Sequence, residues 1–181
     1  MAEREIVVDH LRLTYEGLFS VSELYKMLDT WFRDMGYDKR EMKNIERVAP
    51  EGKYIEIEFL PWKKITDYAV NEIRLRVIMQ NIKEVEIEQE DQKVKLNQGS
   101  IQMIFDGYLT TDYENRWEAK PFFYFLRTLF DKYFFRSYTY GYRQNVVDNV
   151  NNLITQIKSF LNLYRYTETP WVKPAYNFPS L

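Results

Sequence analysis

The sequence predicts an α+β fold in which a meander of antiparallel strands is covered by a long C-terminal helix. Apolar residues recur at every second position through residues 45–113, which is the period of half-buried strands. On both flanks of this stretch they recur at every third or fourth position, as in amphipathic helices. The chain has 181 residues, so we expect one domain over residues 1–166 and a tail over residues 167–181 that contains three prolines.

A strand and a helix are expected first. Leu11, Leu13 and Tyr15 alternate with polar residues, which predicts a strand over residues 7–15. Ser20 and Glu23 have the spacing of a capping box, so the next helix begins here, and Gly36 provides a left-handed stop. The apolar residues of this helix form one stripe that we expect to be buried: Val21, Leu24, Tyr25, Leu28, Trp31, Phe32 and Met35.

Three rows of alternating residues then predict antiparallel strands with one covered face. The rows lie within residues 55–59, 73–79 and 101–109, where apolar side chains alternate with polar or charged ones. Gly107 interrupts the last row and indicates a bulge or a bend.

Residues 84–96 predict a hairpin whose register follows from its two-residue turn. A turn at Glu90 and Asp91 pairs apolar residues across the two strands and pairs two glutamates with two lysines. A shift of one residue would destroy both sets of pairs. We expect the apolar pairs on the inside and the charged pairs outside. The pairs are Val85 with Leu96, Ile87 with Val94, Glu86 with Lys95, and Glu88 with Lys93.

The C-terminal part predicts two further helices. Pro121 fits the first position of an aromatic-rich helix over residues 121–135, and 13 of the 30 residues from 113 to 142 are aromatic. This helix is apolar nearly all round, so the domain, a partner protein, a second copy or a membrane surface must cover it. It is too short to span a bilayer. A longer helix over residues 142–164 carries Val146, Val150, Leu153, Ile154, Ile157, Leu161 and Tyr164 on one side.

Composition excludes several kinds of function. The chain has no cysteine and one histidine, which removes disulfides, thiolate zinc sites and a multi-histidine metal centre. The net charge of −2 provides no field for nucleic acid, and no hydrolase, nucleotide-binding or metalloprotease motif occurs. The charged N-terminus lacks a signal peptide, so we expect a soluble cytoplasmic protein. His10 could be a general base, but an exposed or hydrogen-bonded strand residue is the favoured interpretation.

The order of strand, helix, antiparallel meander and long C-terminal helix resembles the helix-grip fold of the START and Bet v1-like superfamily. The aromatic helix at 121–135 and the tail after 167 depart from that pattern. The resemblance implies an apolar ligand held between a curved sheet and the last helix.

The favoured hypothesis is therefore a non-enzymatic binding protein for an apolar small molecule or lipid, with no cofactor, metal or catalytic residue predicted. The alternative is an interaction or peripheral membrane scaffold that acts through residues 121–135 and the tail. An enzyme is the third class and would have to rely on carboxylates, Lys, Tyr and Arg.

Three aspartates interrupt strand segments where a pocket mouth could lie: Asp67, Asp106 and Asp112. Asp67 shares strand parity with Asn71 on the covered side. The predicted ligand-binding residues are Ile73, Leu75, Phe105, Phe125, Val146, Val150, Ile154, Ile157, Asp67 and Asn71.

Overall fold

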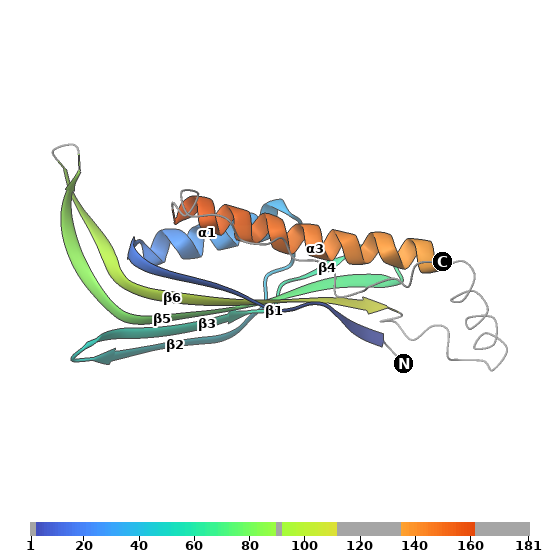
Figure 1. The fold of residues 1–181 in the computed structure, drawn as a ribbon, viewed down its shortest axis with the longest axis horizontal. Coiled ribbons are helices and arrows are strands. Elements are labelled where there is room, and N and C mark those ends of the chain that lie inside the picture. Colours follow the sequence, from blue (N-terminus) through green and yellow to red (C-terminus); the bar gives the residue numbers. More distant parts are fainter. Residues whose placement is uncertain (1–2, 90–91, 112–134, 162–181) are drawn as a thin grey trace, which may run out of the picture.

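The computed structural model describes residues 3–89, 92–111 and 135–161. These residues form a six-stranded antiparallel sheet with two helices on one of its faces (Figure 1). The fold is therefore α+β in class, as the sequence predicts. Residues 121–134 of the expected aromatic helix and the whole tail 167–181 lie outside the described residues.

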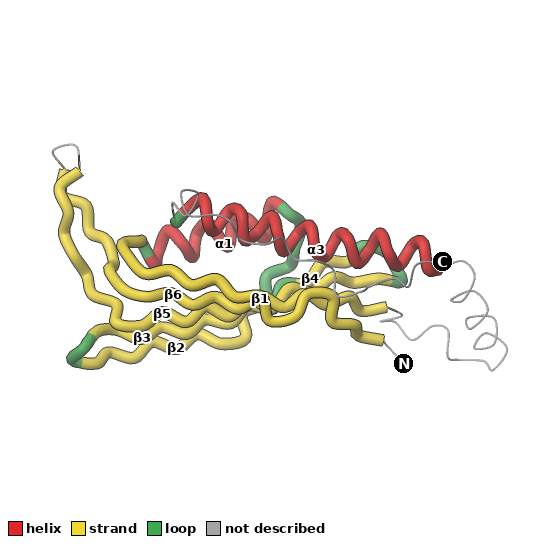
Figure 2. The backbone as a smooth tube through the Cα atoms, viewed as in Figure 1, coloured by secondary structure: helices red, strands yellow, loops and turns green. Residues whose placement is uncertain are grey.

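The sheet has the strand order β1-β6-β5-β3-β2, and the short β4 pairs with β5 beside this path (Figure 2). β5 and β6 are the two longest neighbours and extend together beyond the helices (Figure 1). The elements are β1 (Glu3–Phe19), α1 (Val21–Asp34), β2 (Glu41–Ala49), β3 (Gly52–Phe59), β4 (Trp62–Lys64), β5 (Ala69–Gln89), β6 (Gln92–Thr111) and α3 (Phe135–Phe160).

Both predicted ends of α1 are confirmed. Ser20 is the N-cap, and its Oγ accepts a hydrogen bond from the backbone N–H of Glu23 over 3.3 Å. Gly36 follows the helix in the left-handed conformation, with φ at +71°. The stripe faces the core, where Leu24, Leu28, Trp31 and Phe32 are buried.

The helix predicted over residues 142–164 is α3, and it begins earlier than expected, at Phe135. α3 runs through Gly141, because a glycine inside a helix costs only about 1 kcal/mol relative to alanine. The predicted apolar side of α3 is confirmed, because Val146, Val150, Leu153, Ile154, Ile157 and Leu161 are all buried.

The irregularity predicted at Gly107 is confirmed, and the bulged strand is its neighbour β1. Gly107 pairs with Val8, and the register of β1 shifts on both sides of Val8. A Cβ atom at Gly107 would lie 2.7 Å from Cγ1 of Val146 and 3.2 Å from Cβ of Val8. The missing side chain therefore lets α3 approach the sheet closely at this point.

The register predicted for the β5–β6 hairpin is confirmed at all four pairs. The apolar pair Val85 and Leu96 is half-buried and the charged pair Glu86 and Lys95 is exposed, as predicted, but the apolar pair does not face the helices. Asn97 pairs with the buried Phe19 and accepts a hydrogen bond from the backbone N–H of Val21 in α1, so it lies on the helix side of the sheet. Leu96 and its partner Val85 therefore lie on the opposite side.

In β6 this placement follows from the sequence, because Leu96 and Ile101 are five positions apart and the register with β1 is unbroken from Leu11 to Phe19. In β5 a bulge lies between the two apolar runs. The register of β5 with β6 shifts between Gln80 and Lys83, and Asn81 within the shift has a φ of 55°. The bulge adds one residue to β5. The side chains of β5 beyond it therefore point to the opposite side of the sheet from the one that uninterrupted alternation would give them. The alternation read from residues 73–79 thus does not continue into residues 84–88.

Candidate functional site

The predicted wall residues lie in the core between the sheet and α3. We call this side of the sheet the covered face; Ile73 and Leu75 of β5 and Phe105 of β6 mark it, and none of the three has exposed surface. The structure places the predicted apolar residues of α3 in the same cluster: Val146, Val150, Ile154 and Ile157. Phe125 lies outside the described residues.

A group of amide side chains links the covered face to α3. Nδ2 of Asn71 in β5 donates a hydrogen bond to Oδ1 of Asn145 in α3 over 3.0 Å. Nδ2 of Asn149 donates to the same oxygen over 3.0 Å and lies 2.9 Å from the Tyr37 hydroxyl oxygen, to which it also donates. Asn145 and Asn149 are four positions apart and share one face of the helix. We call these four residues the asparagine–tyrosine cluster.

The cluster runs from the interior to the surface. Asn71, Asn149 and Tyr37 are buried, with exposed fractions of 0%, 6% and 4%. Asn145, by contrast, is exposed. The buried polar groups therefore connect to solvent along one side of α3, beside the point where Val146 contacts Gly107.

The surroundings of Tyr37 keep its hydroxyl protonated to a higher pH than that of an exposed tyrosine. Burial raises the pKa of its hydroxyl to about 12, against the opposing effect of the side-chain amides of Asn149 and Asn71, which favour the phenolate. Its ring stacks on Trp31, with ring centroids 5.8 Å apart. Nε1 of Trp31 in turn donates to Oδ1 of Asn152 over 2.7 Å, which ties the end of α1 to α3.

Asn71 Oδ1 is buried and has no hydrogen-bond partner within residues 3–89, 92–111 and 135–161. Burying an acceptor without a hydrogen-bond donor lowers the stability of the folded protein by about 1–3 kcal/mol. A group that donates a hydrogen bond to Oδ1 would remove this cost, and the neutral Tyr37 hydroxyl can donate as well as accept. The cluster consists of amides and a phenol with a raised pKa, which suits it to binding and orientation rather than proton transfer near neutral pH.

The prediction that Asp67 faces the covered side with Asn71 is wrong. The Asp67 side chain is 80% exposed and pairs with Lys64, with 2.7 Å between the carboxylate oxygen and Nζ. Residues 65–68 form a turn in which Oγ1 of Thr66 accepts from the backbone N–H groups of Tyr68 and Ala69. The strand begins only at Ala69, so the alternation that places Asn71 inside does not reach back to Asp67.

His10 is exposed and hydrogen-bonded, as favoured from the sequence. It lies in the β1 bulge with a φ of 48°, and its backbone N–H donates to Oδ1 of the buried Asp106 over 2.8 Å. Among the described residues, Asp9, His10 and Asp106 are close enough to share a cation. Asp106 is buried because its carboxylate accepts this hydrogen bond from the backbone N–H of His10, which has no partner in the β-ladder at the bulge. Asp112 lies outside the described residues.

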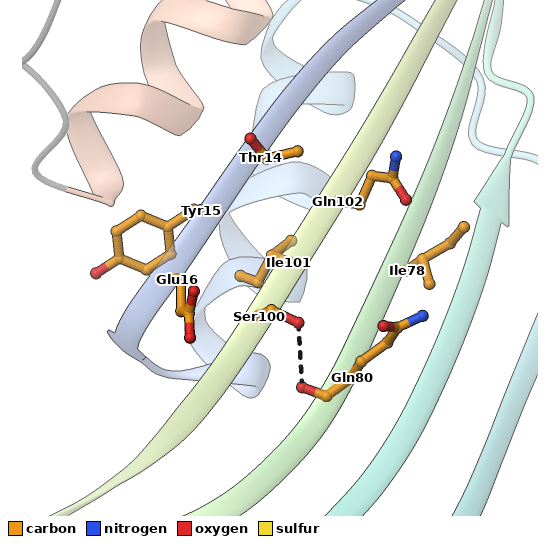
Figure 3. Close-up of a pocket in the computed structure, with 8 residues that line it drawn as sticks. All are labelled: Thr14, Tyr15, Glu16, Ile78, Gln80, Ser100, Ile101 and Gln102. Atoms are coloured by element: carbon orange, nitrogen blue, oxygen red, sulfur yellow. Dashed lines mark hydrogen bonds between the residues drawn. The ribbon is translucent and has the colours of Figure 1, made fainter.

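The opposite side of the sheet, which we call the open face, carries a shallow hollow of about 390 Å³ across β1, β6 and β5 (Figure 3). Thr14 pairs with Gln102 and Glu16 with Ser100. On the other side of β6, Gln102 pairs with Ile78 and Ser100 with Gln80, so two rows of three residues stand side by side. The hollow is lined by Thr14, Tyr15, Glu16, Ile78, Gln80, Ser100, Ile101 and Gln102.

Sequence reasoning did not select this hollow. A change from charged to uncharged side chains among the polar residues of the alternating strands could have revealed it. Positions on the open face of β5 carry Arg74 and Arg76, whereas those in the neighbouring part of β6 carry the uncharged Gln98, Ser100 and Gln102.

No family model, curated protein or solved structure matches this chain. Among the described helices, none has the length and apolar composition needed to cross a bilayer.

Proposed function

We propose that the protein is a non-enzymatic binding protein that holds a ligand with an apolar body between the sheet and α3. The observation that carries the proposal is that Oδ1 of Asn71, in a largely apolar interior, has no hydrogen-bond partner among the described residues. Sites for small molecules are mostly apolar and contain a few placed polar groups that fix orientation. Asn71 and Tyr37 would be these groups, and Ile73, Leu75, Val146 and Val150 would contact the apolar body.

The arrangement of the elements is compatible with the helix-grip architecture. The long α3 lies along one face of an antiparallel sheet, and β5 and β6 curve toward the helix side at their far end (Figure 1). A ligand between sheet and last helix is what the resemblance to the START and Bet v1-like superfamily implies. That relationship remains part of the proposal.

The hydrogen-bonding groups also favour a class of ligand. Asn71 Oδ1 needs a donor, so a hydroxyl or an amide group suits it, whereas a carboxylate would place two acceptors together. Lys63 is the cation near Tyr37, but its Nζ lies 5.7 Å from the ring centroid and donates to the backbone oxygen of Met35. The expected ligand is therefore a neutral apolar molecule or lipid with a hydrogen-bond donor at one end.

Extraction of the purified full-length protein, followed by mass spectrometry, tests this proposal. The expected result is an apolar molecule in near-stoichiometric amount, with at least tenfold less of it in Asn71→Ala. The matched control is Asn44→Ala, because Asn44 is exposed and bonds only the exposed Glu41 within the described chain. A protein that is empty after purification and that does not bind added 1-dodecanol in native mass spectrometry would contradict the proposal.

The alternative, an interaction scaffold, depends on residues 121–135 and 167–181. All of these except residue 135 lie outside the described residues, and that function stays a prediction.

A further inference from the structure

The open face of the sheet is divided into a charged part and a largely uncharged part. Over β2, β3 and β5 the side chains form ion pairs, such as Arg74 with Glu58 at 2.7 Å and Lys43 with Glu56 at 2.8 Å. The hollow lies beside this region, and the polar residues that line it are uncharged except for Glu16. A partner of the hollow therefore meets amides and hydroxyls rather than ion pairs.

The lining contains both hydrogen-bond donors and acceptors at regular spacing. Gln80 and Gln102 each offer an amide that donates and accepts, and Thr14 and Ser100 each offer a hydroxyl. Neighbouring strands are separated by about 4.8 Å, so these groups form a small grid on the sheet. Figure 3 shows Glu16 at one side of this grid, Gln80 and Ile78 at the other, and Ser100 and Gln102 between them.

Short side chains at the centre explain why the surface is hollowed. Ser100 lies between Glu16 and Gln80 in its row, and both neighbours have longer side chains. Its Oγ donates to the backbone oxygen of Gln80 over 3.5 Å, which is at the long limit for a hydrogen bond. The hydroxyl is therefore weakly held and can exchange this contact for one with a ligand.

We propose that the hollow binds a neutral polyhydroxylated ligand, a saccharide. Sugar hydroxyls donate and accept, as the amides and hydroxyls of the lining do, and two of them can donate to the Glu16 carboxylate. The side chain of Ile78 provides an apolar surface for the C–H groups of a sugar ring. Glu16 disfavours an anion at its end of the hollow, whereas Arg12 and Arg76 lie in the next row of the open face, so a titration with phosphate is a necessary comparison. An apolar ligand would leave the amides without partners.

This site is independent of the function proposed above. The hollow opens on the open face, whereas Asn71 and the wall residues lie on the covered face, and the sheet itself separates them. Loss of binding at one site therefore leaves the other testable.

The experiment is an NMR titration of the ¹⁵N-labelled full-length chain with maltose, cellobiose and diacetylchitobiose. At least one of these is expected to shift the backbone amide signals of Ser100 and Gln102 in a saturable way, with a dissociation constant in the millimolar range. Gln102→Ala is expected to weaken this binding at least fivefold. The matched control Gln144→Ala, at an exposed glutamine contact on α3, is expected to leave it unchanged.

Three outcomes would overturn the proposal. One is that none of the three saccharides shifts these signals. Another is that Gln102→Ala, with an otherwise native spectrum, binds as tightly as the natural sequence. The last is that inorganic phosphate, titrated in parallel, shifts the same signals at equal or lower concentration, which would show an anion site instead.

Discussion

Ile104 and Phe105 are neighbours in β6, yet they belong to two different environments. Phe105 faces α3 and has no exposed surface, whereas Ile104 lies half-buried on the open face between Arg12 and Arg76 of the adjacent strands. The covered face is a continuous apolar cluster with a few buried amides. The open face combines ion pairs with an uncharged hollow. The difference shows that one strand sequence encodes two chemically separate surfaces, so functions on the two faces can be separated by mutation.

The largest expected difference between the faces is in packing. Phe105→Ala should lower the free energy of unfolding by about 3–5 kcal/mol, because it leaves a cavity in a fully buried site. Ile104→Ala should cost under about 1.5 kcal/mol, because its side chain contacts solvent in the folded state. Urea denaturation of both variants measures the two losses. Equal losses would show that something covers the open face as completely as the helices cover the other.

The next effect concerns the buried polar groups of the covered face. The pKa of Tyr37 is raised from 10.0 to about 12, so the unfolded chain releases this proton at lower pH than the folded protein. The neutral hydroxyl contributes fully below pH 10, and the contribution of about 3 kcal/mol is lost as pH rises from 10 through about 12.

Urea denaturation between pH 9 and pH 11 measures this dependence. Tyr37→Phe should show a shallower decline of stability with pH than the natural sequence. The control is Tyr140→Phe, at a residue that is 49% exposed. An identical decline in the natural protein and in Tyr37→Phe would show that the Tyr37 hydroxyl titrates as if it were in water.

The smallest expected effect is on the charged part of the open face. Glu58 contacts Nε of Arg74 at 2.7 Å and Nε of Arg76 at 3.8 Å, and the hydrogen bond to Glu58 raises the pKa of Arg74. Because these side chains are partly solvated, Glu58→Gln should cost about 0.2–1 kcal/mol. Urea midpoints with and without 1 M NaCl test this, since salt should shrink the cost. A cost above about 2 kcal/mol, or one that salt does not change, would contradict the distinction between the faces.

Local signals in the sequence were sufficient for α1, for β3, for parts of β1, β5 and β6, and for the hairpin register, whereas β2 and β4 were not predicted. The cap at Ser20 and the stop at Gly36 depend on side chains within a few residues of each other, so they can be inferred without tertiary contacts. The register of β5 with β6 follows from the turn and from matched pairs. Asn71 was also placed correctly on the covered face, since it follows the alternation of Ile73 and Leu75.

The errors occurred where the alternation is interrupted. Asp67 was placed inside because strand parity was extended through residues 65–68, which form a turn closed by Thr66. The apolar pairs of the hairpin lie on the open face because the alternation changes phase between Leu96 and Ile101 in β6, and the bulge at Asn81 changes it in β5. The hollow on the open face was not found because it combines residues from three strands that are far apart in sequence.

The sequence alone determined the class of the fold, the period of each element and the pairing of the longest strands, because these depend on neighbours along the chain. The tertiary structure decided which face of the hairpin turns toward the helices, which amides meet at Tyr37 and where the open face is hollowed. A bulge is a single inserted residue with little local signal, yet it inverts the faces of every residue beyond it. Contacts between segments far apart in sequence, such as Tyr37 with Asn149, exist only once α3 lies on the sheet.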